Sequence, residues 1–255
     1  MPVAPMAPLL THSLVAVLRR SESGSKAFLG LASDGRHYWV KPWNNPQGAR
    51  TLVAELIAYR IGWLIGAPVP EHALLTIPNN FVDSYADGLR LHQGTCHASL
   101  NLEDVIESDE WDTYSRLDDN AYRQAFIVGL WDLCLGGDPQ WLHQTKEDQS
   151  IWTFDHGMWL AGEADWDLPS LRRIGTSEWQ HDVDTSVTSD LGLLAAADAI
   201  DSLSLEDFQA VVSLVPLEWD TDRSELAELA SILFVRSEAV AARLRRAASN
   251  HSHDT

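Results

Sequence analysis

The feature that most constrains the fold is a change in hydrophobic period near residue 50. Before this point, three short runs are separated by turn signals, and Asp34-Gly35 suits a type I′ hairpin because both central residues of that turn need a positive φ. After it, apolar residues between 52 and 65 recur at three- and four-residue spacing, and Gly66 ends the pattern. We therefore predict three antiparallel strands followed by a helix. The predicted strands span residues 14–20, 26–32 and 36–41.

The rest of the chain is predicted to be mostly helical. Residues 72–77 predict a further strand, and residues 120–135 predict a helix that is apolar almost all round and therefore buried. Residues 79–117 show no clear period, and the acidic stretch at 103–112 predicts a solvated helix face or a loop. The other predicted elements are a strand at 151–154 and helices at 191–200, 205–214 and 223–246.

The order of these elements predicts an α+β fold with two lobes. A small antiparallel sheet with one helix occupies residues 1–80, and a mainly helical part occupies residues 81–255, with the break near residues 78–83. A length of 255 residues suits one large domain or two small ones packed tightly together. A cleft between two such parts is a common place for a ligand.

Composition excludes several classes of function. The chain has 37 acidic and 18 basic residues and a net charge of −19, so direct nucleic-acid binding by a broad basic face is not expected. Two cysteines, Cys96 and Cys134, cannot build a disulfide framework, which favours a reducing, cytoplasmic location. Apolar runs are too short for a signal sequence or a membrane span, so we expect a soluble protein.

Three ionic side chains stand where regular elements end. Lys41 is one of only three lysines and closes an aromatic strand, from which its ammonium could reach a phosphate. Asp138 follows the buried helix through two glycines, and Asp155 follows the strand at 151–154. Two carboxylates on separate rigid elements are typical of a hydroxyl-activating base and a metal anchor. Taken singly, these residues would equally suit a surface lysine, a turn cap and a strand end.

A longer set of motifs surrounds these residues. It comprises Ser23-Gly24-Ser25-Lys26-Ala27-Phe28-Leu29, Asp34-Gly35, Tyr38-Trp39-Val40-Lys41, Asn44-Asn45-Pro46-Gln47-Gly48, Ala54-Glu55-Leu56, Gly66-Ala67-Pro68-Val69-Pro70, Asp138 and Asp155-His156-Gly157. Together they resemble the HipA-like kinase family, the compact branch of bacterial HipA-related serine/threonine kinases. The resemblance is most specific from residue 23 to 70, weaker in the catalytic half and slight in the last third.

The resemblance implies a bilobal, protein-kinase-like architecture and a role for each site residue. Lys41 would hold the ATP phosphates, Asp138 would position the substrate hydroxyl, and Asp155 would hold the metal ion. Ser23, Gly24 and Ser25 would form the phosphate-covering turn, although the local sequence suits a plain hairpin turn equally well.

Glu55 is the natural partner for Lys41 in this scheme. On a helical wheel it lies opposite the stripe of Val53, Ile57 and Leu64. A helix wedged between sheet and cleft would place Glu55 beside Lys41, whereas a helix on the surface would leave it in water.

The catalytic half departs from the family pattern, which reads roughly Thr-Asp-x-His-x-x-Asn with the Asn as a further metal ligand. Gly137 precedes the aspartate, Gln140 stands where the histidine is expected, and His143 occupies about the Asn position. Imidazole suits transition metals better than Mg²⁺. His143 could therefore favour Mn²⁺, leave a single metal site, signal lost turnover, or be a histidine with no ligand role.

The resemblance implies a protein kinase that transfers the ATP γ-phosphoryl group to a serine or threonine hydroxyl with Mg²⁺ or Mn²⁺. The alternatives are a nucleotide-binding pseudokinase that acts as a scaffold without turnover, and a small-molecule kinase. The expected partners are ATP, a protein substrate and, by analogy with toxin relatives, a separate antitoxin or regulator. Since ATP carries about four negative charges, its affinity for so acidic a chain should depend on a divalent cation.

Overall fold

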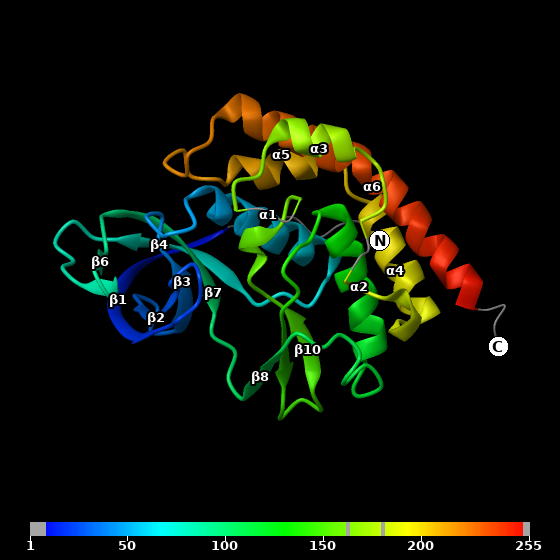
Figure 1. Ribbon diagram of the computed structural model, residues 1–255, viewed down its shortest axis with the longest axis horizontal. Helices are drawn as coiled ribbons and strands as arrows, with labels where there is room; N and C mark the ends of the chain where they lie inside the picture. Colours follow the sequence, from blue (N-terminus) through cyan, green and yellow to red (C-terminus); the bar gives the residue numbers. More distant parts are fainter. Residues whose placement is uncertain (1–8, 162–163, 180–181, 252–255) are drawn as a thin grey trace.

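The computed structural model describes residues 9–161, 164–179 and 182–251. A β-barrel lies at one end and a group of helices at the other, with a small second sheet below them (Figure 1). The strands are β1 (Leu10–Arg20), β2 (Phe28–Ala32), β3 (His37–Lys41), β4 (His72–Ile77), β5 (Ser84–Ala86), β6 (Leu89–Arg90), β7 (Gly94–Leu100), β8 (Val105–Ser108), β9 (Trp141–Gln144) and β10 (Ser150–Thr153). The helices are α1 (Arg50–Ile65), α2 (Asn120–Leu133), α3 (Leu168–Ile174), α4 (Asp190–Asp201), α5 (Leu205–Ser213) and α6 (Arg223–His251), with 3₁₀ turns η1 (His156–Met158) and η2 (Thr185–Val187).

The N-terminal strands close into a barrel in the order β1-β2-β3-β7-β4. Closure depends on β1, which pairs antiparallel with β2 along its second half and parallel with β4 over residues 10–13. The predicted small antiparallel sheet is instead a closed barrel with one parallel pair of strands. The pairing of β1 with β4 leaves this sheet without a free edge. Alternate side chains fill the barrel, among them Phe28, Tyr38, Val40, Leu75, Cys96 and Ala98.

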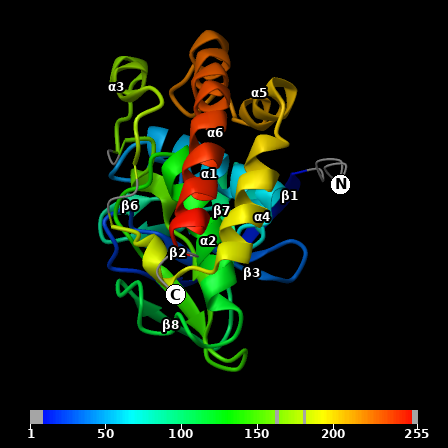
Figure 2. The same cartoon turned by 90° about the vertical axis from the view of Figure 1, so that its right-hand side faces the viewer.

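Most of the predicted elements are present, with shifted ends. Helix α1 begins two residues before the predicted start at 52 and ends at Gly66, whose φ of 81° and backbone N–H bonds to Gly62 and Trp63 close the last turn. Both α1 and α2 are buried on nearly every side, as their apolar sequences require. Helix α6 runs beside α4 and α5 (Figure 2), and these helices share one core with α1 and α2.

The segment at 79–117, which showed no clear period, contains four short strands. The prediction of a helix face or loop at 103–112 was partly wrong. Val105–Ser108 forms β8, which pairs with β9 in the sheet β10-β9-β8. Strand β7 pairs with both β3 and β4. A division of the chain at residue 80 would cut β7 from the barrel, so a division near residue 100 fits the pairing better. Among the described residues, no helix is both long and apolar enough to cross a membrane.

Candidate active site

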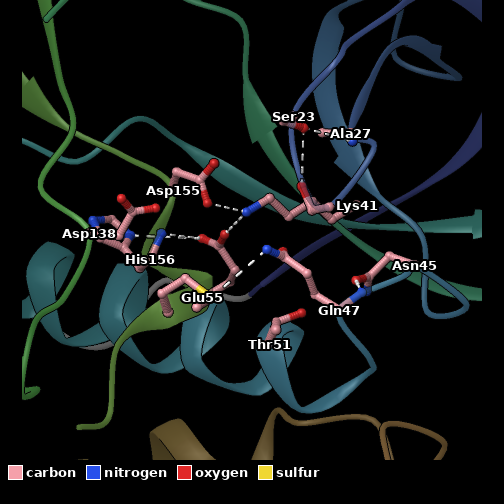
Figure 3. Close-up of polar contacts among 12 residues, drawn as sticks. Ser23, Ala27, Lys41, Asn45, Gln47, Thr51, Glu55, Asp138, Asp155 and His156 are labelled. Carbon is pink, nitrogen blue, oxygen red and sulfur yellow. Dashed lines mark hydrogen bonds and ion pairs between the residues drawn. The ribbon is translucent and has the colours of Figure 1, made fainter. Parts of the chain in front are cut away.

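Three elements that are distant in the sequence bring Lys41, Glu55 and Asp155 together (Figure 3). Lys41 is the last residue of β3, and Glu55 lies in the second turn of α1. Asp155 follows β10 in the left-handed conformation, with φ 56° and ψ 60°, which aspartate tolerates better than most residues. Strand β10 is anchored to the segment after α1, because Thr153 N donates to Pro68 O at 2.9 Å.

The ammonium of Lys41 is shared between two carboxylates. Its Nζ donates to Oε1 of Glu55 and to Oδ1 of Asp155. Oε2 of Glu55 accepts a 3.0 Å hydrogen bond from the backbone N–H of His156, so both of its oxygens are used. The side chain of Glu55 is 2% exposed and that of Asp155 is 24% exposed. Glu55 is therefore fixed, whereas Asp155 reaches solvent.

Burial and charge act in opposite directions on this cluster. Burial by itself would lower the pKa of Lys41, but the carboxylates of Asp155 and Glu55 raise it above its usual value. Burial raises the pKa of Glu55 against the opposing effect of Lys41. Burial also lowers the pKa of His156 well below its usual range, so this imidazole is neutral next to the ammonium. With both carboxylates ionised, the cluster carries one positive and two negative charges.

The cluster forms part of the wall of a cavity of about 630 Å³. The cavity lies between the barrel, α1, the segment from β7 to β8, strand β9 and the residues that follow β10. A cavity of this size is within the range that small-molecule ligands occupy. Its lining comprises Arg19, Ser21, Ser23, Ala27, Trp39, Lys41, Glu55, Tyr59, Pro70, His97, Ser99, Leu100, Asn101, Leu102, Glu103, Asp104, Val105, Glu107, Gln140, Leu142, Phe154 and Asp155.

The predicted Ser23-Gly24-Ser25 turn lies over this cavity. It connects β1 to β2, and Ser23 lines the cavity while Ser25 is buried. Its shape is held by Ser23, whose carbonyl accepts from Lys26 N at 3.0 Å and whose Oγ accepts from Ala27 N at 3.3 Å. The turn thus has a fixed shape and an exposed glycine at its tip.

Asp138 lies on the loop after α2, beside Gln140, and is not itself among the residues that line the cavity. The loop leaves the helix at Gly136, where a Cβ would lie 2.3 Å from the indole of Trp131, so only glycine fits. Asp138 is exposed and has a φ of 56°. Gln140, which lines the cavity, donates from Nε2 to Oδ2 of Asp138 at 2.8 Å. Gln140 therefore orients this carboxylate.

His143 is not brought into the Lys41 cluster. It lies on β9, where Leu142 faces the cavity and His143 points to the other side of the strand. There it is 1% exposed, its Nδ1 lies 3.3 Å from Gln149 O, and its ring packs edge-on against Tyr114 at 4.7 Å. The expectation that His143 holds a metal ion finds no support in this placement, because the strand alternation turns the ring away.

A cluster of aromatic and imidazole rings behind the Lys41–Glu55 pair was not predicted from the sequence. Tyr59 stacks on His72 and His97, with ring centroids 5.5 and 5.1 Å apart, and meets His156 edge-on at 4.5 Å. Tyr59 and His97 also line the cavity. One sequence signal could have placed His97 on a strand, namely the alternation of polar and apolar residues over 95–99. This alternation lies within the segment that showed no clear period.

The donor set near Asp155 suits a metal ion that is held jointly with a nucleotide. In the part of the chain that the structure describes, no group of three or more His, Cys, Asp or Glu side chains could hold a metal ion. Asp155 offers a partly exposed carboxylate, the ligand type that Mg²⁺ prefers, and Mg²⁺ is commonly held by one or two carboxylates plus substrate phosphates.

Comparison with solved structures shows which fold the chain has. The crystal structure of the Helicobacter pylori proinflammatory kinase CtkA has a TM-score of 0.60 and 13% identity, covering 96% of this chain and 99% of that one. The crystal structure of the Golgi casein kinase has a TM-score of 0.48 and 9% identity, covering 94% of this chain and 73% of that one. Of these two structures, only CtkA is similar enough to support an argument, and its similarity shows a kinase-like fold.

The sequence itself gives the family. A family model described as HipA-like kinase matches residues 14–252, which is nearly the whole chain. The chain therefore belongs to the HipA-like kinase family. No curated protein matches this sequence.

Proposed function

We propose that this chain is a protein kinase that transfers the γ-phosphoryl group of ATP to a serine or threonine hydroxyl of a protein. The observation that carries the proposal is the Lys41–Glu55–Asp155 cluster in the wall of the cavity. A strand lysine that pairs with a helix glutamate, beside an aspartate suited to a metal ion, is the arrangement that phosphoryl transfer requires in protein kinases. Membership of the HipA-like kinase family supports the same activity.

In this proposal the nucleotide lies between two lobes. The barrel and α1 form the first lobe up to about residue 100, and the remaining helices with the β8-β9-β10 sheet form the second. Lys41 neutralises charge on the phosphates, and Glu55 holds the ammonium in position for this role. The Ser23-Gly24-Ser25 turn covers the phosphates.

Asp155 is the residue that would hold Mg²⁺ or Mn²⁺ in this site. The bound ion would supply charge neutralisation at the phosphate oxygens. Asp155 suits this role because its side chain is 24% exposed, whereas Glu55 is fully engaged with Lys41 and the His156 backbone. His143 is not part of this proposal.

Asp138 is the proposed base. Its exposed carboxylate can accept the hydroxyl proton of a protein substrate, while Gln140, which lines the cavity, keeps it oriented. The test is Asp138→Asn, which keeps the size of the side chain and the ability to accept from Gln140. We expect at least a hundredfold loss of phosphoryl transfer with unchanged nucleotide binding, within the range for general-base catalysis. Unchanged transfer would refute the role.

A nucleotide-binding scaffold without turnover is the second candidate, and one observation favours it. Gln140 replaces the family histidine, and His143, at the position of the family's second metal ligand, faces away from the cavity. Thermal denaturation with ATP and Mn²⁺, followed by a γ-phosphate transfer assay, separates the candidates. Stabilisation without transfer would favour the scaffold, and absence of stabilisation would count against both.

A further inference from the structure

The loop between β3 and α1 contains a motif that the proposed catalytic roles do not use, Asn44-Asn45-Pro46-Gln47-Gly48. Asn45 is 5% exposed and ties this loop together. Its Nδ2 donates to Pro42 O at 3.0 Å and to Gly48 O at 3.1 Å, while its Oδ1 accepts from Gln47 N at 2.9 Å. Thr51, in the first turn of α1, adds a 2.7 Å bond from its hydroxyl to Gly48 O. The backbone of Gln47 is thereby held in one position.

The side chain of Gln47 reaches two other segments of the site. On one side, its Nε2 lies 2.9 Å from the point where a Cβ on Gly24 would stand, so the amide packs directly against the tip of the β1–β2 turn. On the other side, Nε2 lies 3.9 Å from Sδ of Met158 in η1, the turn that follows Asp155. Gln47 therefore bridges the turn above the cavity and the segment that carries Asp155.

We propose that Gln47 is a positioning residue that clamps the β1–β2 turn, residues 21–27, over the nucleotide cavity. Ser21, Ser23 and Ala27 of this turn line the same cavity as Lys41 and Asp155, so the position of the turn decides how closely its backbone N–H groups approach a ligand. A side chain at 24 would meet the flexible end of Gln47 and displace its amide. The inference rests on the proposed function for the identity of the ligand, ATP.

The clamp predicts a specific kinetic result. Loss of the Gln47 side chain frees the turn but leaves Asp138 and Asp155 in place, so binding should weaken more than the chemical step. For Gln47→Ala we expect the KM for ATP to rise about fivefold, because the packing contact with the turn is lost, with kcat within twofold of the original. Gln209→Ala, an exposed glutamine on α5, is the matched control and should change neither constant. An unchanged KM in an active Gln47→Ala enzyme would overturn the proposal.

A double-variant cycle tests the contact between Gly24 and Gln47 directly. Gly24→Ala should raise the KM for ATP as Gln47→Ala does, because the new methyl group pushes away the flexible end of the glutamine side chain. If this contact is the cause, Gly24→Ala should add less than twofold in a Gln47→Ala background. Full additivity of the two effects would contradict the clamp.

A second readout needs no activity, so it separates this proposal from the proposed function. Amide hydrogen exchange of the 21–27 turn, measured without nucleotide, should be about fivefold faster in Gln47→Ala, while β9 and β10 keep their rates. Lys26 and Ala27 report the change, since both N–H groups bond to Ser23. Absence of transfer by the original protein would refute the kinase function alone. Unchanged exchange in the turn would refute the clamp alone.

Discussion

At the scale of single residues, the two carboxylates on Lys41 have different freedom. Glu55 is buried and uses both oxygens, whereas Asp155 is partly exposed and pairs with Lys41 through one of them. Glu55 therefore fixes the ammonium, and Asp155 is the partner that can turn to a metal ion. A neutral residue at 55 would leave Lys41 bound to Asp155 alone, which ties up the carboxylate that a metal ion needs.

Glu55→Gln tests this division of roles. The amide keeps an acceptor for the His156 N–H but loses the charge-assisted bond to Lys41, which is worth about 1.5–3 kcal/mol. We expect kcat/KM to fall by about 10- to 100-fold, measured by initial rates of phosphate transfer. Glu225→Gln, which changes a carboxylate paired with Arg50, is the control and should keep full activity. A Glu55→Gln enzyme with unaltered kcat/KM would contradict the account.

The rings around Tyr59 make stability sensitive to acid. Burial, followed by the charge of Arg60, lowers the pKa of His72 to about 3. Burial likewise lowers the pKa values of His97 and His156 well below their usual range. Between about pH 6.5 and 3 the unfolded chain therefore binds more protons than the folded one. The stability that these neutral rings contribute is complete above pH 6.5 and declines as the pH falls through this window.

His72→Phe should weaken this acid sensitivity, since phenylalanine keeps a ring against Tyr59 and cannot take up a proton. Each such histidine contributes up to about 1.4 kcal/mol per pH unit, so the variant should lose about 2 kcal/mol less between pH 7 and 5. Chemical denaturation at both pH values measures the difference. An equal slope for His72→Phe and the original chain would refute the argument.

At the scale of elements, a buried ionic group joins the C-terminal helix to the site helices. Asp132, on α2, accepts from Arg236 at 2.7 Å and from Arg243 at 2.6 Å, both on α6. Arg236 also donates to the backbone carbonyl of Asp132, and Arg243 to that of Thr176. Because α2 leads into the loop that carries Asp138, this group connects α6 to that loop.

Two arginines of α6 provide a matched comparison. Arg236→Leu removes one partner of a fully buried carboxylate, and we expect about 3 kcal/mol of lost stability. Arg245→Ala removes an exposed pair with Asp198 and Asp201, and we expect less than about 1 kcal/mol. Denaturant unfolding of both variants measures the two values. If both variants lost the same free energy of unfolding, burial would not explain how much the Asp132 ion pairs stabilise the fold.

The sequence predicts those elements whose signal is local. The end of α1 at Gly66 is set by a positive φ, and the structure has it. The hairpin between β2 and β3 is also present, but the predicted type I′ turn was wrong, because only Gly35 has a positive φ and its N–H donates to Ala32 O at 2.9 Å. Closure of the barrel depends instead on β1 pairing in parallel with β4, some sixty residues away, and no local period encodes such a partner. Strand β7 follows turns and two very short strands, β5 and β6, so its alternation did not stand out from the irregular segment around it.

The same distinction applies to the site. Lys41 and Asp155 stand at strand ends, and the sequence places them there. The position of Glu55 was open on the helical wheel, because a wheel does not show that α1 is covered on both faces. The role of His143 was left open, since a motif gives a position along the chain, whereas the alternation of β9 decides that the ring points away from the cavity.

At the scale of the whole molecule, charge works against nucleotide binding. The chain carries a net charge of −19, and the exposed side chains of Glu103 and Glu107 line the cavity. ATP adds about four negative charges to this field, and Lys41 is already surrounded by two carboxylates. Binding therefore requires a divalent cation to reverse the local charge, so the affinity for ATP should depend steeply on Mg²⁺ or Mn²⁺.

Calorimetric titration with a non-hydrolysable ATP analogue tests the central claim that Lys41 and a cation on Asp155 together bind the phosphates. The original protein should bind in the presence of Mg²⁺ and at least tenfold more weakly in EDTA, and Lys41→Met should lose at least tenfold in Mg²⁺. The account is contradicted if binding is equally tight without the cation, or if Lys41→Met binds as well as the original chain.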